Sequence, residues 1–125
     1  MATVVLTKDD FEECITCNRQ VIVDFWAPWC GPCRAFAPTF EAAAARHPHF
    51  VFAKVNTEEQ QELAASFDIR SIPMLMVFRE GVILYAEPGA LPPAALEDVL
   101  VKVRAVDMVE VHRAVAAQQE SVSPG

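Results

Sequence analysis

The feature that most constrains the fold is the apolar segment Val-Ile-Val-Asp-Phe-Trp at residues 21–26, in which Asp24 is the single charge. A strand with one face in water would alternate apolar and polar residues, whereas a nearly continuous apolar run is typical of a central strand buried on both faces. Helices must then cover both sides of the sheet. The segment therefore predicts an α/β protein, and 125 residues is the length of one ordinary domain.

The remaining sequence predicts alternating strands and helices. Strands are expected at residues 3–6, 21–26, 51–56, 74–79 and 82–87, and helices at 8–16, 30–46, 57–67 and from 92 onwards. Thr57-Glu58-Glu59-Gln60 has the form of a capping box that opens the third helix. The two residues Glu80-Gly81 between apolar runs indicate an antiparallel hairpin.

This order predicts a mixed five-stranded sheet, with a parallel core and a C-terminal antiparallel hairpin, flanked by four helices. We expect residues 1–118 to form a single domain with an extended C-terminal helix, and residues 119–125 to be a frayed tail. Apolar residues beyond 105 either lengthen that helix or contact another chain. A monomer is expected, with a weak dimer as the alternative.

Charge and hydropathy exclude several classes of function. The chain has 10 Lys and Arg against 17 Asp and Glu, a net charge of -7, and an acidic surface repels the phosphates of nucleic acids. No apolar stretch approaches the ~18–20 residues that span a membrane, and the N-terminus lacks the pattern of a signal peptide. We therefore expect a cytoplasmic protein, in which cysteines are redox-active, metal-binding or buried thiols.

Cys30 and Cys33 stand where the strand at 21–26 ends and a helix begins. The free N–H groups and partial positive charge of a helix start stabilise a thiolate, so Cys30 is the expected nucleophile, exposed to a partner. Cys33 is one turn further and more covered, yet close enough to form a disulfide. Gly31 leaves room for a partner's backbone, and Pro32 breaks no helical hydrogen bond. This arrangement is typical of thiol–disulfide exchange.

The alternatives for the pair are half of a zinc site or structural thiols. Zinc needs four ligands, and the second pair, Cys14 and Cys17, belongs to a different predicted helix. We expect no metal. Cys14 and Cys17 are interpreted as buried thiols without a role in the reaction, with a regulatory disulfide as the alternative.

Residues 23–34, Val-Asp-Phe-Trp-Ala-Pro-Trp-Cys-Gly-Pro-Cys-Arg, resemble the active-site signature of the thioredoxin family. The likeness continues in Ala37-Pro38, in Ala53-Lys54-Val55-Asn56, in Ile69-Arg70-Ser71-Ile72-Pro73 and in Gly89-Ala90, in order across residues 1–105.

The resemblance implies the thioredoxin fold and a protein-disulfide reductase that acts as an electron carrier in cell redox homeostasis. In such a protein Cys30 attacks a client disulfide and Cys33 resolves the mixed disulfide. No cofactor is bound, because reducing equivalents come from NADPH through a flavin-dependent thioredoxin reductase. The implied partners are that reductase and disulfide-containing client proteins.

The resemblance also implies roles for residues around the cysteines. Asp24 corresponds to a buried carboxylate that assists proton transfer at Cys33; burial raises the pKa of such an acid, and the alternative is a structural pair with Lys54. Pro73 corresponds to a cis-proline facing the disulfide. The implied substrate-binding residues are Trp29, Gly31, Pro32, Ile72, Pro73 and Gly89, and Lys54 and Pro38 are implied structural supports.

One departure from the family bears on substrate specificity, and two alternative functions remain. Met74 stands where family members usually carry Thr, which places a flexible thioether beside the substrate. An oxidase or isomerase would use the same chemistry in reverse, although Gly31-Pro32 favours a reductase. A scaffold, co-chaperone or complex subunit using the same surface is the alternative from another functional class.

Overall fold

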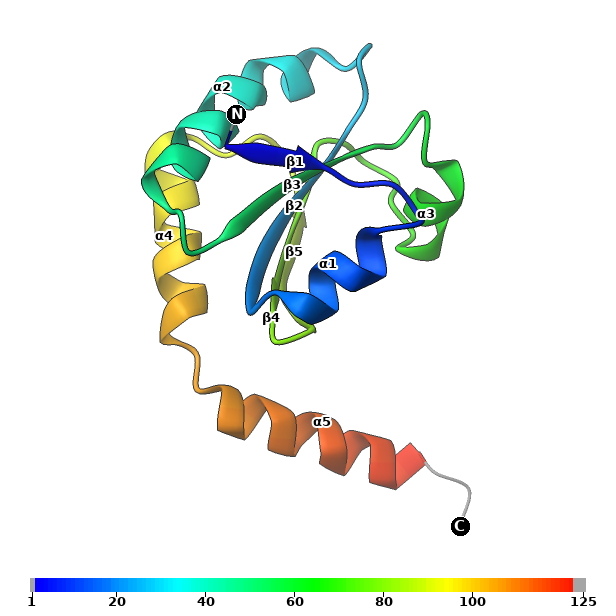
Figure 1. Cartoon of the computed structure of the whole chain (residues 1–125), viewed down its shortest axis with the longest axis vertical. Helices are drawn as coiled ribbons and strands as arrows, with labels where there is room; N and C mark the ends of the chain where they lie inside the picture. The colour runs from blue at the N-terminus through cyan, green and yellow to red at the C-terminus, as the bar shows by residue number, and fades with distance from the viewer. Residues whose placement is uncertain (1, 123–125) are drawn as a thin grey trace.

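The computed structural model describes residues 2–122, in which five strands form one sheet in the order β1-β3-β2-β4-β5 (Figure 1). The strands are β1 (Thr3–Val5), β2 (Gln20–Trp26), β3 (Val51–Asn56), β4 (Met74–Arg79) and β5 (Val82–Pro88). Strands β1, β3 and β2 are parallel, whereas β4 is antiparallel to both β2 and β5. The mixed sheet expected from the sequence is confirmed.

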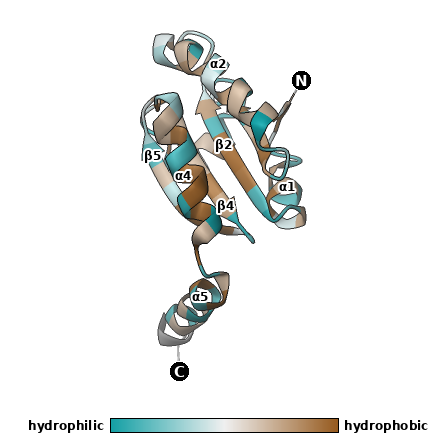
Figure 2. Cartoon of the chain, turned by 90° about the vertical axis from the view of Figure 1, so that its left-hand side faces the viewer, coloured by the Kyte–Doolittle hydropathy of each residue, from teal (hydrophilic) through white to brown (hydrophobic). Residues whose placement is uncertain are grey.

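The central strand β2 is buried on both faces, as its apolar sequence predicts. Val21, Val23 and Phe25 pack into one core with side chains of α1 (Phe11–Cys17) and α3 (Gln61–Ser66). Ile22, between them in the sequence, packs on the opposite face with side chains of α2 (Gly31–Arg46) and α4 (Pro93–Ala105). Figure 2 shows the strong hydrophobicity of β2 between these layers. Asp24 shares the face of Ile22, because side chains alternate along a strand.

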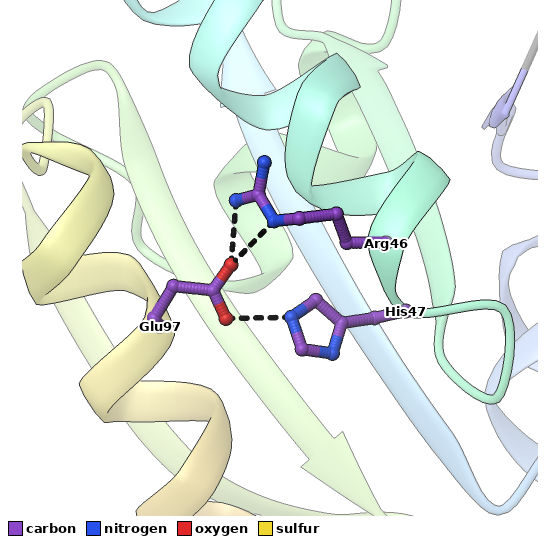
Figure 3. A network of polar contacts seen from close by, with 3 residues as sticks. All are labelled: Arg46, His47 and Glu97. Atoms are coloured by element: carbon purple, nitrogen blue, oxygen red, sulfur yellow. Dashed lines mark hydrogen bonds and ion pairs between the residues drawn. The ribbon is translucent and has the colours of Figure 1, made fainter.

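A three-residue network holds the end of α2 against α4 (Figure 3). Nε and Nη2 of Arg46 donate to Oε1 of Glu97 at 2.9 and 2.5 Å, and Nε2 of His47 lies 2.6 Å from Oε2 of the same carboxylate. These bonds fix the far end of the helix whose first turn carries the cysteines. Pro38 lies inside α2, which runs without interruption from Gly31 to Arg46.

The capping box predicted at Thr57–Gln60 is wrong, because α3 begins only at Gln61 and Gln60 makes no side-chain cap. The backbone N and Oγ1 of Thr57 instead donate to the carbonyl oxygen of Trp26, at 2.8 and 3.0 Å. The Asn56 side chain accepts from the backbone N of Glu58 at 3.0 Å. Residues 57–59 therefore form a turn, and Thr57 supplies the hydrogen-bond donors for the carbonyl oxygen at the end of β2.

The prediction of one extended C-terminal helix is also wrong. The helix breaks after Ala105, and α5 (Met108–Val122) points in a different direction, so the described residues contain five helices instead of four (Figure 1). Residues 119–122 of the expected frayed tail belong to α5, and residues 123–125 lie outside the described residues. None of the helices in the described part of the chain is long and apolar enough to cross a membrane.

Side chains at both sides of the break explain where it falls. Nη1 of Arg79, at the end of β4, donates to the carbonyl oxygens of Val103 and Val106 at 3.1 and 2.7 Å, which satisfies the end of α4. Asp107 accepts from the backbone N of Val109 at 3.0 Å and therefore caps the start of α5. The sequence Asp107-Met-Val-Glu110 has the capping-box form, a signal that could have located this boundary.

Candidate active site

The site is built at the junction of β2 and α2. Cys30 occupies the N-cap position of α2 with an extended backbone, φ -85° and ψ 113°. Its Sγ accepts a hydrogen bond from the backbone N of Cys33 at 3.2 Å. The sulfur therefore faces the positive end of a 16-residue helix, where a thiolate is stabilised.

A disulfide joins Cys30 to Cys33, with their Cα atoms 5.2 Å apart, so the structure holds the oxidised form. The expectation of an exposed Cys30 is wrong for this form, because Cys30 is only 5% exposed and Cys33 is 2% exposed. Ala27 packs against both, and Trp26 and Ile72 complete the surrounding apolar cluster. Only a small part of Cys30 is therefore open to a partner in the oxidised form.

The residues expected to face the disulfide come from the loop before β4 and the end of β5. The Ile72–Pro73 peptide bond is cis, as predicted. The carbonyl oxygen of Ile72 lies 3.8 Å from Sγ of Cys30. The backbone N of Gly89 donates to the carbonyl oxygen of Pro73 at 2.8 Å, which ties the end of β5 to this loop.

The surface next to the disulfide contains an exposed apolar side chain and two exposed small residues. Trp29, adjacent to Cys30 in the chain, is 67% exposed, an unusual value for so large an apolar side chain. Gly31 and Pro32 are also exposed in the first turn of α2. The six residues predicted to bind substrate thus belong to three segments that meet at this end of the molecule.

Asp24 is buried in β2 with 1% exposure, and neither carboxylate oxygen has a hydrogen-bond partner among the described residues. Burial raises the pKa of Asp24 to about 7, although the charge of Lys54 opposes the rise. Cys33 is buried on α2, which covers the sheet face that carries Asp24. The carboxyl group therefore lies on the side of the sheet that α2 and the Cys33 sulfur cover.

Lys54 is the cross-strand neighbour of Asp24 on β3. Its ammonium lies 4.8 Å from the centroid of the Trp26 ring and makes no contact within 4.0 Å of a carboxylate in the part of the chain that the structure describes. The geometry is that of a cation–π contact. It does not support a hydrogen-bonded structural ion pair between Lys54 and Asp24.

Arg34 contributes to the site, although the sequence reasoning assigned it no role. Nη1 of Arg34 donates to the carbonyl oxygen of Pro28 at 2.8 Å and so braces the loop that carries Trp29 and Cys30. Its position one turn after Cys30, inside the signature segment, is a signal that could have pointed to it.

Cys14 and Cys17 lie on α1, which covers the opposite face of the sheet from α2, and both are free thiols. Burial raises the pKa of the half-buried Cys14. The expectation of a buried thiol is wrong for Cys17, which is exposed at the end of its helix. Within residues 2–122, no three His, Cys, Asp or Glu side chains form a group that could hold a metal.

Comparison with known proteins agrees with this geometry. The thioredoxin family model matches residues 2–102. The chain belongs to the thioredoxin family. A candidate thioredoxin 2 of Streptomyces coelicolor is 55% identical over 118 residues, which cover 94% of this chain and 88% of that relative. That similarity therefore extends into the C-terminal segment beyond the family model.

Other relatives match a smaller share of the chain. Thioredoxin of Porphyra purpurea is 42% identical over 92 residues, covering 73% of this chain and 86% of the relative. A solved thioredoxin of Plasmodium falciparum has a TM-score of 0.74 at 34% identity and covers 80% of this chain and 97% of its own. The protein is a dithiol–disulfide oxidoreductase whose redox-active pair is Cys30–Cys33, and proteins of this family need no bound cofactor for the exchange.

Proposed function

We propose that the protein reduces disulfides of client proteins, with Cys30 as the attacking thiol and Cys33 as the resolving thiol. The observation that carries the assignment is the N-cap position of Cys30, whose sulfur accepts the backbone N–H of Cys33. In the reduced protein the same donor and the helix end stabilise negative charge on Cys30. Cys33, buried one turn further on, has no such position.

The reaction proceeds in two exchanges of the same type. The Cys30 thiolate attacks one sulfur of the client disulfide, an S–S bond forms between Cys30 and the client, and the second client sulfur leaves as a thiolate. Cys33 then loses its proton and attacks Sγ of Cys30. The mixed disulfide breaks, the reduced client leaves, and the Cys30–Cys33 disulfide holds the two-electron oxidation.

We assign to Asp24 the acceptance of the Cys33 proton in the second exchange. A carboxyl group whose pKa is raised to about 7 by burial is ionised to a useful extent near neutral pH and still basic enough to take a proton. Its oxygens are committed to no other partner among residues 2–122. Lys54, which lowers this pKa by its charge, would adjust the balance between the two forms.

The client-binding surface in this proposal consists of Trp29, Gly31, Pro32, Ile72, Pro73 and Gly89. The exposed Trp29 ring offers an apolar contact beside the reacting sulfur. The carbonyl oxygen of Ile72, 3.8 Å from that sulfur, offers a backbone acceptor to an extended client segment. Pro38 and Lys54 support this surface from α2 and β3.

The oxidised pair must be reduced again for turnover. The family resemblance supports a flavin-containing thioredoxin reductase that draws on NADPH, and we place the cycle in the cytoplasm, where such a reductant is maintained. Disulfide-containing proteins are the client class that the family indicates.

The test is disulfide reduction assayed as NADPH consumption with a thioredoxin reductase and a disulfide-containing protein. The wild type should turn over, Cys30→Ser should be inactive, and Cys33→Ser should accumulate mixed disulfides that mass spectrometry maps to Cys30. Cys17→Ser, a matched change at an exposed thiol, should behave as wild type. Mixed disulfides trapped on Cys33 in Cys30→Ser, but not in the reverse variant, would invert the assignment. Client binding without turnover would favour a scaffold.

A further inference from the structure

Three arginine side chains line one pocket at the end of the sheet opposite the active site. A hollow of about 220 Å³ is bordered by Arg19, Gln20, Arg79 and Arg104. Cys30 follows the carboxyl end of β2, whereas Arg19 immediately precedes its amino end. The pocket and the disulfide therefore lie at opposite ends of the same strand, and the pocket belongs to no part of the site described above.

The sheet register explains why residues so distant in sequence meet here. Gln20 and Arg79 are paired across β2 and β4, and the backbone N of Glu80 donates to the carbonyl oxygen of Arg19 at 2.8 Å. Arg104 comes from the last turn of α4, and its carbonyl oxygen accepts from Nη1 of Arg79 at 3.0 Å. Strand pairing, the bend before β2 and the end of α4 thus bring the backbones of the three arginines to one pocket.

The positive charges of this pocket form no ion pair with the residues that the structure describes. The whole chain has 10 Lys and Arg, and three of its arginines converge here although the net charge is -7. No carboxylate oxygen lies within 4.0 Å of Arg19, Arg79 or Arg104 among residues 2–122. Like charges that line one pocket repel one another, and an anion bound among them relieves that repulsion.

Hydrogen-bond donors remain available in the pocket. Arg79 uses Nη1 for the carbonyl oxygens at the end of α4, while its Nε and Nη2 have no acceptor in the described part of the chain. Glu80, the neighbouring acid, is engaged by Nε2 of His112 at 2.9 Å. The pKa of His49 is lowered by desolvation and then by the charges of Arg104 and His47, so the positive field reaches the adjoining loop.

We propose that this arginine pocket, formed by Arg19, Arg79 and Arg104, binds a tetrahedral oxyanion of charge -2, the chemistry of a phosphate group. Planar guanidinium forks bind phosphate oxygens through paired N–H donors, and such bonds to charged groups are stronger than neutral ones. A volume of about 220 Å³ is several times the ~30 Å³ of one water molecule, so the hollow holds such a group with part of its hydration.

The probe is inorganic phosphate at about pH 8, where it is a dianion, added at constant ionic strength with sodium chloride. Binding is followed by nuclear magnetic resonance of the backbone amides and arginine Nε–H groups of the oxidised protein. Saturable shifts confined to the arginine pocket are expected. Arg104→Gln and Arg19→Gln should each weaken binding about tenfold, the loss of one charge-assisted hydrogen bond. Arg79 is left intact because it also holds the end of α4.

Arg113→Gln is the matched control, because it removes the same charge from an exposed arginine paired with Glu110 on α5. It should bind phosphate as wild type does, and circular dichroism should show every variant folded. Sulfate should compete with phosphate, and acetate, a monoanionic carboxylate, should bind at least tenfold more weakly. Shifts that do not saturate, equal loss in Arg113→Gln, or acetate binding as tightly as phosphate would each overturn the proposal.

Discussion

Asp24→Asn tests whether a buried, unpaired carboxyl group stands behind the disulfide. The substitution keeps the size of the side chain and removes its ability to ionise. Asp24 is 1% exposed and has no hydrogen-bond partner among the described residues. The folded protein therefore holds its ionised form at a cost that the unfolded chain does not have.

The size of that cost follows from the pKa. Burial raises the pKa of Asp24 from 3.8 to about 7, and each pKa unit corresponds to about 1.4 kcal/mol. Because the folded pKa lies above the unfolded one, the cost is absent below pH 3.8, grows as the pH rises, and reaches about 4 kcal/mol above pH 7. Asp24→Asn should therefore be more stable than wild type by up to about 4 kcal/mol at pH 8 and equal to it at about pH 3, below the unfolded pKa of 3.8.

Urea unfolding of the oxidised proteins across this pH range measures the difference. Asp9→Asn, an exposed aspartate, is the matched control and should change stability by less than about 0.5 kcal/mol at every pH. Asp24→Asn should also slow client reduction near neutral pH, because Cys33 loses its proton acceptor. A gain in stability that does not depend on pH would refute this reasoning. A loss of stability at pH 8 would refute it too, and would favour a structural pair with Lys54.

Three further outcomes are expected. Replacing both Cys14 and Cys17 with Ala should leave turnover within a few-fold of wild type, since α1 and α2 cover opposite faces of the sheet. Mass mapping after mild oxidation checks this in the wild type: a readily formed Cys14–Cys17 disulfide that alters turnover would contradict the prediction. The pKa of Glu97 is lowered chiefly by its bond to Arg46, so Glu97→Gln should lower the free energy of unfolding at pH 7 by at most about 1 kcal/mol, seen as a lower Tm. This loss should disappear as the pH falls below the ordinary pKa range of glutamate. An equal loss at low pH would argue against a charge contribution. Asp107→Ala should remove about 1 kcal/mol of capping from α5 and speed its amide exchange about fivefold, and unchanged exchange would show that the cap does not hold that helix.

Local patterns in the sequence were enough to predict the central strand of the sheet and the reactive cysteine pair. Residues 21–26 form the buried strand because no other placement removes so many consecutive apolar side chains from water. Cys30 and Cys33 bond to each other because only two residues separate them at a helix start, and that geometry is local. The raised pKa of Asp24 followed from a single acid in an apolar strand, a pattern that is also visible in one short segment.

The features that the sequence reasoning missed depend on partners distant in the chain. Thr57 bonds the carbonyl of Trp26 instead of capping a helix, because parallel strands β2 and β3 end side by side. The helix predicted to run from residue 92 to the C-terminal region ends at Ala105, where Arg79 of β4 donates to the terminal carbonyl oxygens of α4. That arginine meets Arg19 and Arg104 only through the register of β2 and β4 and the packing of α4. Hydrophobic periodicity records which face of an element is buried, whereas the polar groups that meet at its ends are determined by how the elements pack.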